Sequence, residues 1–118
     1  MMTHATQVTH AMRLNSPWFD IVKSGKKIYE GRRWSEKIEM ITPGDYIEFR
    51  YVNDESQKIK VKVIEILRFN TFEEALNIIP INDVLYGGLT IEEGVEIYKK
   101  YVSIETQMRD GVCLIKIE

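Results

Sequence analysis

The sequence predicts a single α+β domain with a strongly curved β-sheet and helices packed around it. Three observations support this prediction. The chain has 118 residues, 44% hydrophobic and 29% charged, as expected for one soluble globular domain. A long strand-like segment changes its apolar phase midway, which favours a curved sheet over a flat one. Two Thr-x-x-Glu sequences mark helix starts.

The first eleven residues differ from the rest of the chain. Residues 1–11 are polar and rich in Thr and His, without the basic start and apolar stretch of a secretory signal. We therefore expect a disordered leader at 1–11 and one domain at 12–118.

A short helix follows the apolar segment Met12–Leu14. Ser16 is placed to cap this helix, and Pro17 suits its first turn. Gly25 supplies the left-handed conformation that ends such a helix, so its predicted length is about two turns.

A charged strand is predicted from Lys27 to Trp34. Strand alternation places Glu30 and Arg32 on one side and their neighbours on the other, and neither side is purely apolar. After an irregular stretch, Thr42-Pro43-Gly44-Asp45 has the composition of a tight turn.

Two longer strands, 46–52 and 58–67, are separated by a polar connection and should pair antiparallel. In the second, apolar residues alternate with Lys58, Lys60 and Lys62 until the phase slips by one residue. We therefore predict a bulge or bend near Val63 and Ile64.

The C-terminal half contains two capping boxes, beginning at Thr71 and Thr90. The first helix should end before Pro80, and the second should run to about Tyr101. A last strand is predicted at 112–117.

Positive charge is concentrated in one segment. The net charge is −2, but residues 23–37 hold six basic and two acidic residues, a local charge of +4 that leaves −6 for the rest. Phosphate binding requires positive potential, so this segment favours a nucleic-acid face on an acidic globule.

Common catalytic and metal-binding sets are not apparent. Both histidines, His4 and His10, fall in the expected leader, where they do not fix a metal geometry. The single cysteine, Cys113, lies in an apolar strand and is expected to be a core residue. No apolar run approaches the roughly 20 residues of a membrane span. We expect a cytoplasmic protein without a metal or cofactor and without a membrane partner.

The candidate site is the charged strand itself. Glu30 and Arg32 can hold each other in place, while basic side chains bind phosphate. The alternative is a solvated edge strand whose charges prevent aggregation. The predicted phosphate-binding or electrostatic residues are Lys26, Lys27, Arg32 and Arg33, and the predicted stacking surfaces are Tyr29, Trp34 and Tyr51. Glu30 should orient Lys27 and Arg32 or accept a base amino group, and in an enzyme Lys27 and Glu30 would be the catalytic candidates.

These residues also carry a family resemblance. The pattern Gly25-x-Lys27-x-x-Glu30-x-Arg32, after a first helix and before Pro43-Gly44-Asp45, resembles the signature of ASCH domains. Phe72-Glu73-Glu74 and Gly111-Val112 continue it, so the resemblance covers 12–118. It implies a PUA-like mixed β-barrel of about five to six strands, two to three flanking helices, and a cleft for RNA.

Three functions remain open. The first is a module that binds RNA or a nucleotide through Lys27, Glu30 and Arg32. The second is a small hydrolase, because some ASCH relatives deacetylate N4-acetylcytidine and at least one is a ribonuclease. Lys27 matches the catalytic lysine of the amidohydrolases, whereas Glu30 stands where they carry threonine, and Tyr86-Gly87-Gly88-Leu89 occupies the region of their catalytic glutamate. The third is an interaction domain using the tyrosine-rich helix at 90–101.

Overall fold

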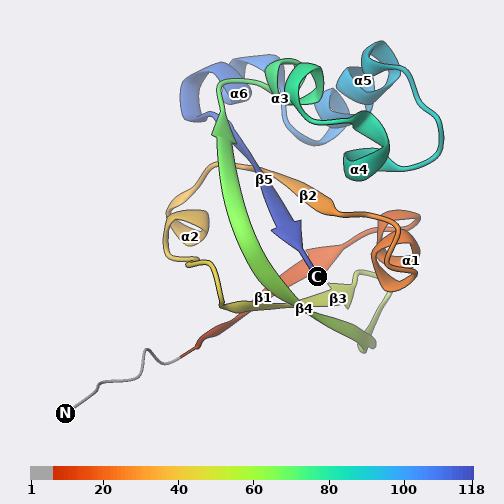
Figure 1. Ribbon diagram of the computed structural model, residues 1–118, viewed down its shortest axis with the longest axis vertical. Coiled ribbons are helices and arrows are strands. Elements are labelled where there is room, and N and C mark those ends of the chain that lie inside the picture. Colours follow the sequence, from red (N-terminus) through yellow and green to blue (C-terminus); the bar gives the residue numbers. More distant parts are fainter. Residues whose placement is uncertain (1–6) are drawn as a thin grey trace.

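The computed structural model describes residues 7–118, which form a mixed five-stranded sheet with most of the helices gathered at one end (Figure 1). The chain is α+β, as predicted. The elements in chain order are β1 (Thr9–Leu14), α1 (Trp18–Lys23), β2 (Tyr29–Arg33), α2 (Glu36–Glu39), β3 (Tyr46–Tyr51), β4 (Asp54–Phe69), α3 (Phe72–Ile78), α4 (Ile81–Leu85), α5 (Ile91–Tyr101), α6 (Ile104–Asp110) and β5 (Val112–Ile117).

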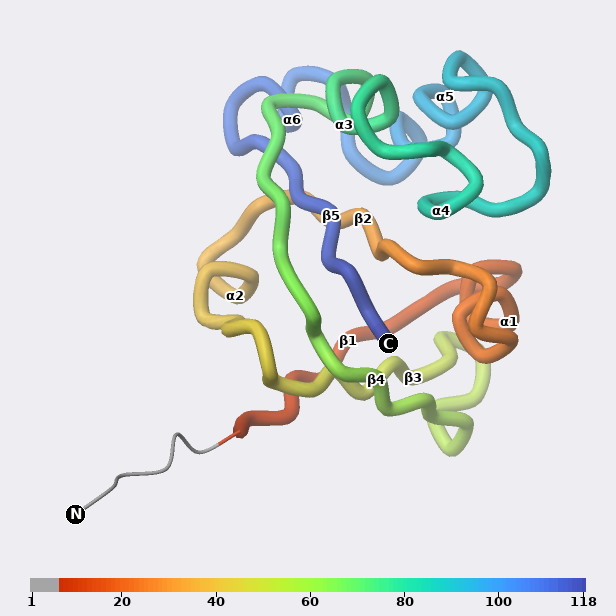
Figure 2. The backbone as a smooth tube through the Cα atoms, in the orientation of Figure 1, coloured from red at the N-terminus to blue at the C-terminus, as the bar shows by residue number. Residues whose placement is uncertain are grey.

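The strand order is β1-β3-β4-β5-β2, so β1 and β2 form the two edges. The β1 and β3 strands run parallel, and the other pairs are antiparallel. Figure 2 follows this order, with the blue β5 between the green β4 and the orange β2. Within residues 7–118 the edges do not pair with each other, so the expected barrel is instead an open mixed sheet.

The long strand β4 connects the two parts of the sheet. Its first part pairs with β3 and its last part with β5. Between Val63 and Glu65 the register against β5 shifts, which confirms the bulge predicted at Val63 and Ile64. The extra residue restores the inward direction of the apolar side chains, because side-chain direction in a strand alternates with every residue.

Two apolar cores lie against this sheet. The first includes Phe49, Val63 and Phe19, and packs the sheet against α1. The second includes Phe72 and Leu85, and lies between the sheet and α3, α4 and α5.

Local signals placed several elements correctly. The Thr71 and Thr90 side chains accept hydrogen bonds from the backbone N–H of Glu74 and Glu93. At Thr90 the Glu93 side chain also accepts from the Thr90 backbone N–H, which completes the predicted capping box, whereas the Glu74 side chain accepts from the Asn70 side chain instead. Gly25 has φ +78° at the end of α1, as predicted. The Ser16 cap is wrong, because Pro17 occupies the N-cap position and no side chain caps the helix.

Other expectations need correction. The β1 strand begins at Thr9, so residues 9–11 belong to the sheet rather than to a leader, and pairing with β3 holds them there. His4 lies outside the described residues. The short helices α2, α4 and α6 were not predicted, since runs of four to seven residues show little periodicity.

Candidate functional site

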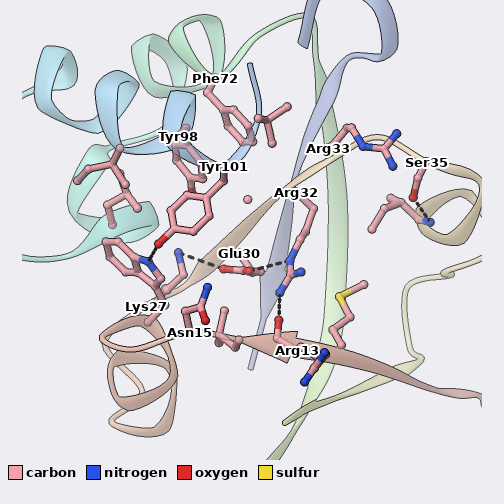
Figure 3. A pocket seen from close by; sticks show the side chains of 18 of the residues that line it. Arg13, Asn15, Lys27, Glu30, Arg32, Arg33, Ser35, Phe72, Tyr98 and Tyr101 are labelled. Atoms are coloured by element: carbon pink, nitrogen blue, oxygen red, sulfur yellow. Dashed lines mark hydrogen bonds and ion pairs between the residues drawn. The ribbon is translucent and has the colours of Figure 1, made fainter. Parts of the chain in front are cut away.

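A cavity of about 510 Å³ lies where the sheet stays open, between β1, β2 and the helices α1 and α5 (Figure 3). Two sequence segments far apart from the charged strand complete its walls. Met12 to Asn15 lie on one side, and Tyr98, Tyr101 and Val102 on another. The predicted site residues that line it are Lys27, Glu30, Arg32 and Arg33.

Three of these charges form one cluster. Oε1 of the Glu30 carboxylate lies 3.4 Å from Lys27 Nζ. Its Oε2 accepts a 2.8 Å hydrogen bond from Arg32 Nε. Glu30 and Arg32 are two residues apart on β2, so their side chains share the face toward the cavity. The predicted convergence of the three residues on a concave site is confirmed.

Arg32 also connects the two edges of the sheet. Its Nη2 donates a 2.8 Å hydrogen bond to the backbone carbonyl of Arg13 in β1. This contact spans the opening between the two edge strands, as the dashed line in Figure 3 shows. One guanidinium therefore both pairs with Glu30 and fixes the width of the cleft.

Lys27 is much more deeply buried than Arg32. The exposed fraction of its side chain is 1%, against 28% for Arg32. Its Nζ donates to the carbonyl of Val84 and lies 5.8 Å from the centroid of the Trp18 ring. Desolvation lowers the pKa of Lys27, an effect that Glu30 partly opposes. Arg32 is consequently the member of the cluster that a ligand can reach.

Aromatic residues that sequence reasoning missed form the rest of the wall. Trp18 and Tyr101 meet across the cavity, where Trp18 Nε1 donates a 3.2 Å hydrogen bond to the Tyr101 hydroxyl. Tyr98 stacks on Phe72 with 3.8 Å between ring centroids. Burial, followed by the charge of Glu30, raises the pKa of Tyr98, so its hydroxyl keeps its proton and remains a donor.

Gly31 makes this wall possible. A Cβ atom at Gly31 would lie 2.4 Å from the Tyr98 hydroxyl oxygen, far inside van der Waals contact. Only glycine lets α5 approach β2 this closely. The tyrosine-rich helix α5 thus lines the cavity. The sequence alone indicates it only as a separate interaction surface.

Four predicted site residues do not line the cavity. Tyr29 points away from Glu30 into the second core, because successive strand residues face opposite sides. Tyr51 packs on Phe19 in the first core, with 5.2 Å between the two ring centroids. Lys26 lies over the Tyr86 ring, and Trp34 lies beneath Arg68.

The remaining candidates have structural partners. His10 is in β1, and its Nε2 lies 2.9 Å from Asp45 Oδ2. Cys113 is a core residue whose pKa burial raises to about 12, so its thiol stays protonated. Among residues 7–118 no group of three or more His, Cys, Asp or Glu side chains is arranged to hold a metal ion. In that same range, no helix combines the length and apolar character needed to cross a membrane.

The fold and cleft define a class of small α+β domains in which a charged pocket lies between the two edges of an open mixed sheet and the helices beside them. The family model of the ASCH domain matches residues 12–118, and the chain belongs to this family.

Two solved structures are similar over nearly the whole chain. The crystal structure of hypothetical protein PH0355 has 39% sequence identity and a TM-score of 0.84, covering 94% of this chain and 98% of that one. The solution NMR structure of protein PF0455 from Pyrococcus furiosus has 36% identity and a TM-score of 0.76, covering 94% and 96%. No curated protein matches.

Proposed function

We propose that this chain binds RNA and holds one unpaired nucleotide in the cavity between β1 and β2. The observation that carries this proposal is the combination of a net positive ion cluster with aromatic rings in one cavity. Its volume of about 510 Å³ is within the range of small-ligand sites, roughly 300–1,000 Å³. Membership of the ASCH family, which is associated with RNA binding, supports the proposal.

The side chains have different roles in this proposal. Arg32 contacts a phosphate or a base edge, since its guanidinium keeps donors free beyond those used by Glu30 and Arg13. Glu30, itself paired with the buried Lys27, holds the Arg32 guanidinium in position. The rings of Trp18 and Tyr101 offer stacking surfaces for the base. Lys26 and Arg33 add electrostatic attraction outside the cluster.

Titration of an unstructured RNA oligonucleotide at several salt concentrations tests this function. We expect a slope of log K against log salt of roughly −2 to −3, because each neutralised phosphate on a single strand contributes about 0.7. Arg32→Ala should lower the affinity and flatten the slope by about 0.7.

Arg50→Ala is the matched control, because Arg50 pairs with Glu48 on a strand in the same way but does not line the cavity. Neutralising Lys58, Lys60 and Lys62 is a second control on exposed strand positions. No binding at low salt, or binding that depends on those lysines and not on Arg32, would contradict the proposal.

A hydrolase acting on a modified nucleoside is the second candidate. The favouring observation is that Lys27 is buried beside the cavity with a lowered pKa, which increases the neutral amine needed for proton transfer. Incubation with N4-acetylcytidine tests it. Deacetylation by the wild type that Lys27→Met abolishes, with Arg50→Ala unaffected, would establish it, and no turnover would exclude that substrate.

A further inference from the structure

A second hollow, of about 770 Å³, lies next to the cavity. Arg33, Ser35 and Lys37 line both spaces, so the two adjoin along one segment of the chain. Arg68 and Arg109 line the second hollow but not the first. The two spaces therefore share a border at Arg33, Ser35 and Lys37.

The charges of this hollow suit an anionic strand. Its lining holds four basic residues, Arg33, Lys37, Arg68 and Arg109, against three acidic ones, Glu36, Glu39 and Asp110, a local charge of +1. Of the acids, Asp110 forms ion pairs with Arg33 at 3.2 Å and with Arg109 at 2.9 Å. Lys37 donates to the backbone carbonyl of Ala11, which uses one of its three ammonium protons. Positive groups with unused donors thus lie at the junction of the two spaces.

The hollow also contains a stacking platform. The Arg68 guanidinium lies over the Trp34 ring with 4.2 Å between its Cζ atom and the ring centroid. Its Nη2 donates to the backbone carbonyl of Asp110 at 3.4 Å, and the side chain is exposed. Nucleobases stack on guanidinium planes as well as on aromatic rings, so Arg68, supported by Trp34, offers a surface for a base.

We propose that the second hollow binds the nucleotide next to the one in the cavity, with its base on Arg68 and the linking phosphate beside Arg33 and Lys37. This inference rests on the proposed RNA binding and specifies its substrate class. The ligand is an RNA strand of at least two nucleotides rather than a free nucleoside or nucleotide.

Binding of a length series to the full chain tests the inference. Isothermal titration with a nucleoside monophosphate, a dinucleotide and a hexanucleotide should show the dinucleotide binding about tenfold more tightly than the monophosphate. Arg68→Ala with Arg109→Ala should remove that gain and leave monophosphate affinity within about twofold of wild type. Lys58→Ala with Lys60→Ala removes the same charge from exposed β4 positions and should preserve the gain.

The two tryptophans provide an independent readout, because Trp18 lines the cavity and Trp34 lines the second hollow. In the Trp18→Phe variant, Trp34 is the one remaining tryptophan and reports on the second hollow. At saturating ligand, its fluorescence should change when the dinucleotide binds and stay unchanged when the monophosphate binds.

Monophosphate binding without a gain in affinity for longer RNA would overturn this inference and leave the proposed function standing. A gain that survives the Arg68 and Arg109 changes would also overturn it. Absence of binding at every length would overturn both.

Discussion

Two Glu-x-Arg sequences lie in strands of this sheet, Glu30-x-Arg32 in β2 and Glu48-x-Arg50 in β3. In each, the arginine Nε donates a 2.8 Å hydrogen bond to Oε2 of the glutamate two residues earlier. The side chains of Glu30 and Arg32 are 7% and 28% exposed, whereas those of Glu48 and Arg50 are 25% and 42% exposed. Only the first pair has a buried lysine beside it and lines a cavity.

The difference comes from the position of each strand in the sheet. The β3 strand is an inner strand, with Ile47 and Phe49 facing the core and Glu48 and Arg50 facing out. The β2 strand is an edge strand whose Glu30 face meets the opening toward β1. An identical local pair is thus a surface feature in one strand and the basis of a cleft in the other.

The largest expected difference is between the free energies of unfolding of the Glu30→Ala and Glu48→Ala variants. Glu30→Ala leaves the buried ammonium of Lys27 without its carboxylate and should lower the free energy of unfolding by about 3–5 kcal/mol. Glu48→Ala breaks a more exposed pair and should cost less than about 1 kcal/mol. Urea unfolding followed by circular dichroism measures both. Equal losses would show that burial does not separate the two pairs.

The losses of stability on replacing Arg32 and Arg50 should differ by less than those of the two glutamates. Arg32→Ala removes the hydrogen bonds to Glu30 and to the Arg13 carbonyl, and should destabilise the fold by about 1–3 kcal/mol. Arg50→Ala should cost less than about 1 kcal/mol. Native-state hydrogen exchange adds a local test, because loss of the bridge between the edges should increase exchange in β1 more than in β4. Unchanged exchange in β1 would contradict the bridging role.

The smallest effect is a pH dependence at Lys27. Between its lowered folded pKa and the ordinary value of 10.5, the unfolded chain holds a proton that the folded chain has lost. Stability therefore rises with pH in this window and is independent of this group below it. The stability of wild type relative to Lys27→Met should increase by up to about 1.4 kcal/mol per pH unit there.

Chemical denaturation at several pH values toward 10.5 measures this difference. Lys62→Met, at an exposed β4 position, is the control and should show a much flatter profile. A difference that falls as pH rises would mean that the attraction of Glu30 outweighs desolvation.

Much of the fold is set by signals within a few residues. The hydroxyls of Thr71 and Thr90 cap their helices, and the phase slip at Val63 places the bulge in β4. The spacing of Glu30 and Arg32 correctly put both on one face. The short helices escaped prediction because burial, more than periodicity, holds them in place, as in α4, where Val84 and Leu85 are buried.

The cleft depends on residues from distant parts of the chain. Trp18, Tyr98 and Tyr101 meet beside β2 although more than eighty positions separate the first from the last. The aromatic residues nearest the charged strand in sequence, Tyr29 and Trp34, lie elsewhere. Proximity in sequence therefore identified the charges that line the cavity but not its rings.

The sequence by itself determined the α+β class, the antiparallel pairing of β3 with β4, the bulge and the charged strand, because steric preference, side-chain alternation and capping act between near neighbours. Only the tertiary structure decided that the sheet stays open, that β1 pairs parallel with β3, and that Glu30 rather than Glu48 is buried. Desolvation of a charge depends on every atom packed around it, and here those atoms come from β1, α1, α4 and α5.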